Sequence, residues 1–253
     1  GSVTLTTSGT TGNASVVNAS ALDLAASSVG GNLIATATTG NVTDTGIVTV
    51  GGTTNITTTN ADDDIDLGSL ASTGPVTLTT SGTTGNATVV NASALDLAAS
   101  TVGGNLAVTA TTGNLTDSGA VAVGGTTTLT TSAANATIDV GTTASTGAVS
   151  LNTNGASGSA TIVHANALDL GVSSVGGNLV ATATTGNVTD SSTVTVGGTT
   201  NITTLNADDD IDLGSLASTG SVTLTTSGTT GNASVANASA LDLAASSVGG
   251  NLI

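Results

Sequence analysis

Apolar and polar residues alternate in short runs along the whole chain. Examples are the segments Val3–Thr7, Leu22–Leu24, Val48–Val50 and Ile65–Leu67. A period of two is typical of a β-strand with one buried face. Thr and Val suit a pleated strand, whereas Gly, Asn, Ser and Thr are mediocre or poor helix formers. The pattern therefore predicts an all-β protein, and it argues against the disorder that low complexity and high net charge would otherwise indicate.

The same runs recur as a 73-residue repeat without insertion or deletion, because Gly1, Gly74, Gly147 and Gly220 each open the same motif. A fixed period of this kind is typical of stacked repeats, in which each unit contacts its neighbours. We expect one continuous domain over residues 1–253, with repeat units 1–73, 74–146 and 147–219 and a partial unit 220–253. Residues 1–34 match residues 220–253 at all but one position, so we interpret the chain as a window of a longer array.

Gly-led segments begin at Gly1, Gly30 and Gly51 and divide the first repeat unit into three pieces, and the later units are divided in the same way. We interpret each piece as one coil of a parallel β-solenoid with three strands, which gives three coils per repeat and about ten in the chain. Strands of successive coils would pair about 4.8 Å apart. The paired glycines at Gly30 and Gly31, Gly51 and Gly52 are expected at corners with positive φ. The predicted interior consists of Val3, Leu5, Val16, Leu22, Leu24, Leu33, Val42, Val48, Val50, Ile56, Ile65, Leu67 and their equivalents.

The charged side chains are almost all negative: the chain has sixteen aspartates and no Lys or Arg, and its formal net charge is −16. No salt bridge between side chains of opposite charge is expected, so stability must come from backbone ladders and aliphatic packing. Nucleic acids are held by Lys, Arg and aromatic rings, and this chain has none of these. No apolar run reaches the roughly 20 residues of a spanning helix. We therefore expect neither nucleic-acid binding nor membrane insertion of this segment.

The motif from Gly31 to Asp44, followed by Val48 to Thr54, resembles the β-strand repeats of filamentous-haemagglutinin-like secreted proteins and related giant bacterial surface adhesins. This resemblance covers the whole chain. It implies a right-handed parallel β-helix, export across the bacterial envelope, and roles in adhesion, biofilm formation or contact-dependent interactions. The lack of Lys, Arg and aromatic residues departs from a receptor-binding surface and favours a shaft.

The expected function is the structural shaft of an extracellular filament, sheath or giant adhesin at the cell surface. Its expected partners are other copies of itself, end to end or laterally in a fibre, and other cell surfaces. No enzyme is expected, because the carboxylates repeat along the chain, where a catalytic site would be unique. The alternative function is binding of a ligand at a repeated surface, either ice through threonines or calcium through aspartates.

The calcium alternative depends on carboxylates stacked one coil apart, for example Asp66 beside Asp96, since calcium prefers several oxygen ligands. No cofactor is otherwise required. A solvated acidic face that keeps fibres apart is the competing interpretation. The candidate ligands are Asp44, Asp62, Asp64, Asp66, Asp96, Asp190, Asp208, Asp210 and Asp212.

The ice alternative depends on a grid of threonines on one face, formed by residues such as Thr36, Thr57, Thr79 and Thr109. Threonine is also a favoured outward strand residue, which weakens this signal.

The single histidine, His164, takes the place of an asparagine in the other repeats. We predict that it is a structural substitution and neither a metal ligand nor a catalytic base.

Overall fold

The computed structural model describes all 253 residues, and all of its regular elements are β-strands. The strands fall into two compact units, Gly1–Thr126 and Thr127–Ile253. The protein contains no helix long and apolar enough to cross a membrane. The all-β prediction is confirmed, while a single continuous domain over residues 1–253 stays a prediction.

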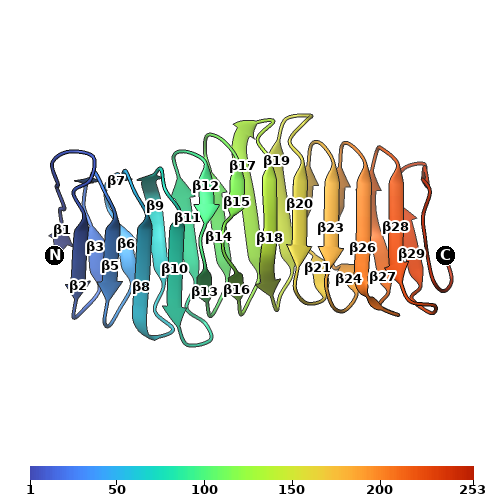
Figure 1. Ribbon diagram of the computed structural model, residues 1–253, viewed down its shortest axis with the longest axis horizontal. Helices are drawn as coiled ribbons and strands as arrows, with labels where there is room; N and C mark the ends of the chain where they lie inside the picture. The colour runs from blue at the N-terminus through green and yellow to red at the C-terminus, as the bar shows by residue number, and fades with distance from the viewer. The chain divides into compact units, whose positions relative to one another are not determined.

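The first unit contains two parallel sheets (Figure 1). Its first sheet contains β1 (Ser2–Val3), β3 (Leu22–Leu24), β4 (Ser27–Val29), β6 (Val42–Asp44), β7 (Val48–Val50), β9 (Ile65–Ser72), β11 (Ala87–Asn91) and β14 (Leu106–Ala110). Its second sheet contains β2 (Ala14–Asn18), β5 (Leu33–Ala37), β8 (Thr54–Ala61), β10 (Val76–Ser81), β12 (Leu95–Leu97), β13 (Ser100–Val102), β15 (Leu115–Asp117) and β16 (Val121–Val123).

The second unit is built in the same way. One of its sheets contains β17 (Thr127–Ala134), β19 (Val149–Asn154), β21 (Leu168–Leu170), β22 (Ser173–Val175), β24 (Val188–Asp190), β25 (Val194–Val196), β27 (Ile211–Ser218) and β29 (Ala233–Asn237). The other contains β18 (Ile138–Ser145), β20 (Ala160–His164), β23 (Leu179–Ala183), β26 (Thr200–Ala207) and β28 (Val222–Ser227).

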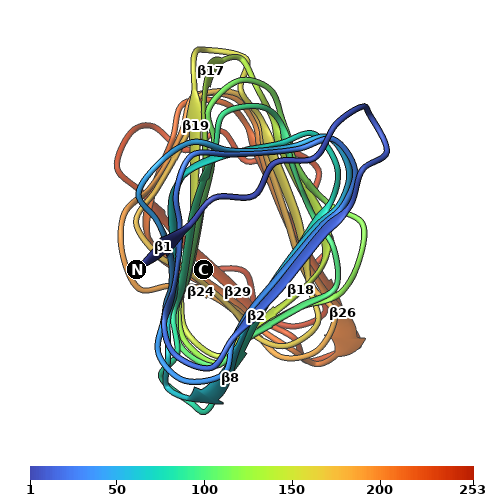
Figure 2. The ribbon, with the colours of Figure 1, turned by 90° about the vertical axis from the view of Figure 1, so that its left-hand side faces the viewer.

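Each strand pairs in parallel with the strand one turn later in the chain. Leu22 pairs with Val42, Val42 with Ile65, and Ile65 with Ala87. Figure 2 views the chain from its N-terminal end, and the first unit coils clockwise as it recedes. Each unit is therefore a parallel β-solenoid, and the coil of the first is right-handed, as predicted. With about eleven turns in the two units together, the number of turns is also close to the predicted ten.

The number of strands per turn varies with the length of the strands. A turn such as β2, β3 and β4 has three strands, because one face is divided into two short strands. The turn formed by β8 and β9 has two strands of eight residues each. Three strands per turn is thus one of two arrangements within the same two-sheet solenoid.

One 73-residue repeat spans three and a half turns, half a turn more than predicted. Leu22 lies in the first sheet of the first unit, whereas Leu95, its equivalent in the next repeat, lies in the second sheet. In the second unit, Ala160 and Ala233 are likewise on different sheets. The cause is the length of a turn, which runs from a residue to its ladder partner, as from Val3 to Leu24. The repeat is not a whole multiple of this length, so equivalent residues of successive repeats face opposite sides.

The interior is largely aliphatic, but it also contains buried polar side chains that the prediction omitted, such as Thr54, Ser72 and Asn91. The predicted core residues from Leu22 to Leu67 are at most 1% exposed. Val3, Leu5 and Val16 are half-buried, because β1 and β2 have a neighbouring strand on one side only. Burial of such side chains is the main favourable term in folding.

The paired glycines lie where backbones of successive turns approach closely. A Cβ atom on Gly51 would collide with the carbonyl oxygen of Gly30, and one on Gly30 with that of Gly9. The paired glycines do not have positive φ, which occurs instead at other glycines such as Gly40 and Gly82, with φ of 81° and 82°. The prediction of positive φ at the pairs is wrong, since the stacking of turns, and not the backbone conformation, excludes a side chain there.

We predict that Gly51→Ala destabilises the protein by about 1–3 kcal/mol, the usual range for overpacking. The measurement is the free energy of unfolding in urea. Gly68→Ala is the matched control, because a Cβ on Gly68 would have only the Asp44 Oδ1 atom nearby, at 3.8 Å. Equal losses in the two variants would contradict the proposed role of close backbone approach.

Candidate functional site

The acidic segment 62–64 follows β8 and caps the backbone of adjacent turns. Asp62 has a left-handed backbone with φ of 65°. Its Oδ1 atom accepts hydrogen bonds from the N–H groups of Thr83 at 3.0 Å and Thr84 at 2.9 Å. These bonds, that of Thr84 above all, lower the pKa of Asp62. Asp208 has the same conformation and bonds, and its pKa is lowered in the same way.

The middle repeat has an uncharged residue at this place. Asn135 replaces the aspartate, with φ of 63°, and its Oδ1 atom accepts a hydrogen bond from the N–H of Ser157 at 3.0 Å. Asn and Asp both tolerate left-handed backbone and offer a side-chain oxygen. The shared function of the three residues is therefore to accept backbone hydrogen bonds, and this function does not need a charge.

The next two carboxylates bind the turns on either side. Asp63 Oδ2 accepts a hydrogen bond from Gly40 N–H, one turn earlier, at 2.5 Å. Asp64 Oδ1 accepts one from Asn86 N–H, one turn later, at 2.7 Å. Asp209 and Asp210 repeat both contacts in the second unit. The acidic segment therefore connects three successive turns.

Asp44, the last residue of β6, lies beside a bulge in β9. The pairing of β9 with β11 shifts between Val89 and Asn91, so that β9 holds an extra residue. Asp44 accepts hydrogen bonds there from Gly68 N–H at 2.9 Å and Ser69 N–H at 2.8 Å. Burial nevertheless raises the pKa of Asp44, and repulsion by Asp66 and Asp23 adds to the rise.

Asp190 repeats this arrangement in the second unit. It accepts hydrogen bonds from Gly214 N–H and Ser215 N–H, and burial raises its pKa. Asp117, the third copy, also has an interaction partner.

The predicted row of stacked aspartates does not form. Asp66 pairs with Thr43 on one side and Thr88 on the other, while Asp96 pairs with Thr116 in the opposite sheet. Asp139 and Asp169 are likewise on different sheets of the second unit. The predicted stacking of Asp66 on Asp96 is wrong, because a repeat contains a half-integral number of turns.

Three equivalent aspartates have one oxygen atom that is buried without a hydrogen-bond partner. These atoms are Oδ1 of Asp23, Asp96 and Asp169. No group of three or more His, Cys, Asp or Glu side chains is arranged to hold a metal ion. Of the nine predicted calcium ligands, seven accept a backbone or hydroxyl hydrogen bond from a neighbouring turn, and Asp66 and Asp96 lie on opposite sheets. The calcium site stays a prediction from sequence that the geometry does not assemble.

The threonines are also divided between the two sheets. In the second sheet of the first unit, Thr36, Thr57, Thr79 and Thr101 follow one another in register. Thr109 lies in the first sheet. A single grid on one face is therefore wrong, and what remains is a row one residue wide.

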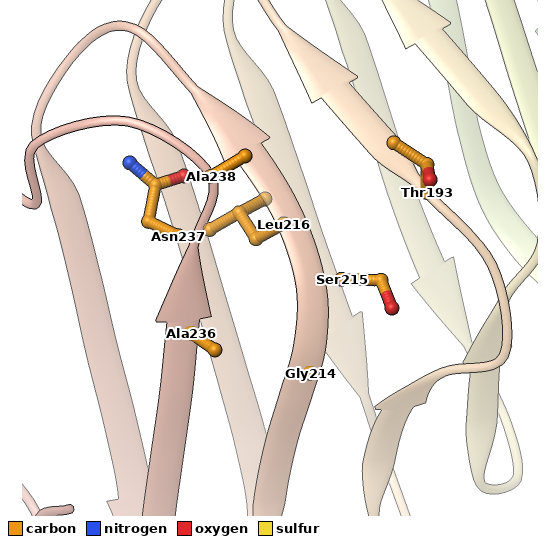
Figure 3. A pocket seen from close by; sticks show the side chains of 7 residues that line it. All are labelled: Thr193, Gly214, Ser215, Leu216, Ala236, Asn237 and Ala238. Carbon is orange, nitrogen blue, oxygen red and sulfur yellow. The ribbon is translucent and has the colours of Figure 1, made fainter.

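Each unit has a shallow groove beside the bulge. Figure 3 shows the groove of the second unit, of about 330 Å³, where β27 lies between Thr193 on one side and Ala236 on the other. The first unit has the equivalent groove, of about 250 Å³, in which Ile47 replaces Thr193. The residues lining the groove in Figure 3 are Thr193, Gly214, Ser215, Leu216, Ala236, Asn237 and Ala238. Neither groove is lined by an acidic or a basic side chain.

His164 is a structural substitution, as predicted. It is 1% exposed, and its Nε2 atom accepts a hydrogen bond from Ser145 N–H at 2.7 Å. Asn91, its equivalent in the first unit, accepts the corresponding bond from Ser72 N–H.

A family model described as Repeats of unknown function (DUF5649) matches residues 11–79, 84–152 and 157–225. The chain belongs to this family. The three matches follow one another at the same interval as Gly1, Gly74 and Gly147, so the family's unit corresponds to the structural repeat of three and a half turns. Comparisons with curated proteins and with solved structures found no match.

We predict that Asp62→Ala lowers the urea midpoint of unfolding more than Asp62→Asn does. The asparagine keeps the acceptor oxygen, as Asn135 does, whereas alanine leaves Thr83 and Thr84 without it and adapts poorly to positive φ. Unfolding in urea at pH 7 measures both variants. Equal losses would show that the negative charge, and not the acceptor, is what matters.

Asp44→Asn should gain stability relative to the wild type as the pH rises. Because the folded-state pKa of Asp44 is raised, its ionised form destabilises the folded protein, and protonation removes this cost below roughly pH 4. The advantage of the variant should therefore be largest at pH 7 and shrink toward pH 3.5, as followed by unfolding midpoints across this range. A constant difference at all pH values would contradict the raised pKa.

Proposed function

We propose that this chain is a shaft segment of an extracellular bacterial fibre or giant adhesin, with a mechanical and spacing role at the cell surface. The observation that carries the proposal is the uniform stacking within each unit. Every turn is bonded to the next by a parallel backbone ladder, and the pattern is free of inserted domains or long loops. Repeats that contact only their neighbours form extended structures.

The side chains that could in principle bind a ligand or take part in catalysis support the same proposal. The aspartates of segments 62–64 and 208–210 accept backbone hydrogen bonds from neighbouring turns, and His164 is buried. The two grooves are lined by small or aliphatic residues together with Ser, Thr and Asn. Such a chain offers regular surface and little catalytic equipment, which favours a structural role over an enzyme.

The resemblance of the motif at residues 31–54 to filamentous-haemagglutinin-like repeats supports the extracellular location and the association of copies end to end or side by side. The surface charge fits this environment, since a chain with no Lys or Arg offers no cleavage site to trypsin-like proteases. The high net negative charge would also keep neighbouring fibres apart, except where specific contacts bring them together.

A length series tests the shaft. Chains extended by two, four and six additional 73-residue units should lengthen by about 17 Å per unit, which is three and a half turns at about 4.8 Å each. Electron microscopy of the purified chains measures this length. Particles that grow in width, or that stay the same length, would overturn the proposal.

The surface location is tested separately. Antibodies against the purified chain should label intact cells of the source organism, and a cytoplasmic protein of the same cells is the matched control. Labelling only after the cells are broken open would contradict an extracellular role without affecting the result of the length series.

A further inference from the structure

The hydrogen bonds of His164 require a neutral imidazole ring. Nε2 accepts the hydrogen bond from Ser145 N–H at 2.7 Å, so it carries no proton. Nδ1 lies 3.2 Å from the carbonyl oxygen of Asn166, which only accepts hydrogen bonds, so Nδ1 carries the proton and donates it. A second proton could bind only at Nε2. There it would face the N–H of Ser145 and break the bond that joins β20 to the end of β18.

The equivalent asparagines make comparable contacts without a titratable group. Asn91 Oδ1 accepts the hydrogen bond of Ser72 N–H at 2.8 Å, and Asn91 Nδ2 donates to Ala94 O at 2.8 Å. Asn237 Oδ1 accepts that of Ser218 N–H at 2.8 Å. The imidazole thus imitates an amide, with Nε2 in the role of Oδ1 and Nδ1–H in the role of the Nδ2 donor. Only the imidazole can change its charge between pH 5 and 8.

We propose that His164 makes the stretch from β18 to β20 an acid-sensitive point of the solenoid, which opens locally in mildly acidic surroundings while the equivalent turns at Asn91 and Asn237 stay closed. This inference does not depend on the fibre function, because it concerns the stability of one turn. In a chain of near-identical repeats, it gives one turn a response to pH that its counterparts lack.

No other positively charged side chain lies near His164, and few negative charges are near enough to stabilise a protonated ring. β20 pairs with β18 and β23. On β18 the one titratable residue is Asp139, which is exposed and pairs with Thr161, three residues before His164. β23 and β19 carry none, and β21 carries Asp169. Burial is the main cause that lowers the pKa of His164, against the smaller opposite effect of the carbonyl groups of Asn166 and Ala167.

The sign of the effect follows from this lowered pKa. The unfolded or opened segment binds a proton near pH 6.5, whereas the folded segment binds it only at lower pH. Folding is therefore fully favoured above pH 6.5 and weakens as the pH falls below it. If the closed turn excludes the proton, the equilibrium constant for opening rises about tenfold between pH 7.5 and pH 5.5.

Hydrogen exchange tests the proposal within one molecule. The three equivalent amides are those of Ser72, Ser145 and Ser218. Between pH 7.5 and pH 5.5, the protection factor of Ser145 should fall about tenfold, while those of Ser72 and Ser218 stay level. Equal protection of Ser145 at both pH values, or an equal fall at all three amides, would overturn the proposal.

His164→Asn is the matched variant, since Asn is the residue at the equivalent positions 18, 91 and 237. It should fold, retain the protection of Ser145 at pH 5.5, and keep every aspartate, so that any remaining pH dependence belongs to the carboxylates. If this variant loses protection in acid as the wild type does, His164 is not the cause. The reciprocal variant Asn91→His should transfer the acid sensitivity to Ser72.

The tautomer has its own measurement. His164 is the only histidine, so nitrogen NMR of the ring is unambiguous. The expected spectrum at pH 7.5 is that of a neutral ring protonated at Nδ1. A ring protonated at Nε2, or one that titrates near pH 6.5 in the folded protein with Ser145 still protected, would contradict the argument.

Discussion

The parallel hydrogen-bond ladder between successive turns is the constraint on which the rest of this protein depends. It fixes the length of a turn, as where Val3 pairs with Leu24, and it places inward-facing residues of successive turns directly above one another. The stacked core of residues such as Leu22, Val42 and Ile65 follows from this register. The close approach of backbones at the paired glycines follows from it as well.

The ladder leaves backbone N–H groups without partners at the corners, and short polar side chains supply the missing acceptors. Asp62, Asp44 and Asn32 each accept hydrogen bonds from the next turn. Buried or half-buried N–H groups need such partners, since an unsatisfied one costs about 1–3 kcal/mol. The aspartates thus have a structural explanation. Asn135 takes the place of Asp62 in the next repeat, which shows that the acceptor oxygen atom matters more than the charge for this capping.

Much of the candidate site was predictable as a set of residues, but not as an arrangement. The alternation around Ile65 correctly predicted which residues point inward, because period two is a local property of a strand. It could not show that Asp66 and Asp96 lie on opposite sheets. The sheet on which each residue lies depends on the length of the sequence repeat divided by the length of one turn. Corner residues that form a bulge or lengthen a turn change this ratio without changing the alternation of apolar and polar residues. The sequence showed that His164 stands at an asparagine position, whereas its two hydrogen bonds could be known only from the folded structure.

The sequence by itself determined the strand class, the period of the repeat and the aliphatic core, because each of these follows from local residue preferences and from repetition. Only the tertiary structure decided which equivalent residues of successive repeats share a face and which loop each aspartate caps. It also decided why a side chain is excluded at the positions of the paired glycines. These features depend on what lies one full turn away along the chain, as Thr54 does from Leu33. Contacts at that separation are set by the register of the ladder, and the ladder exists only in the folded protein.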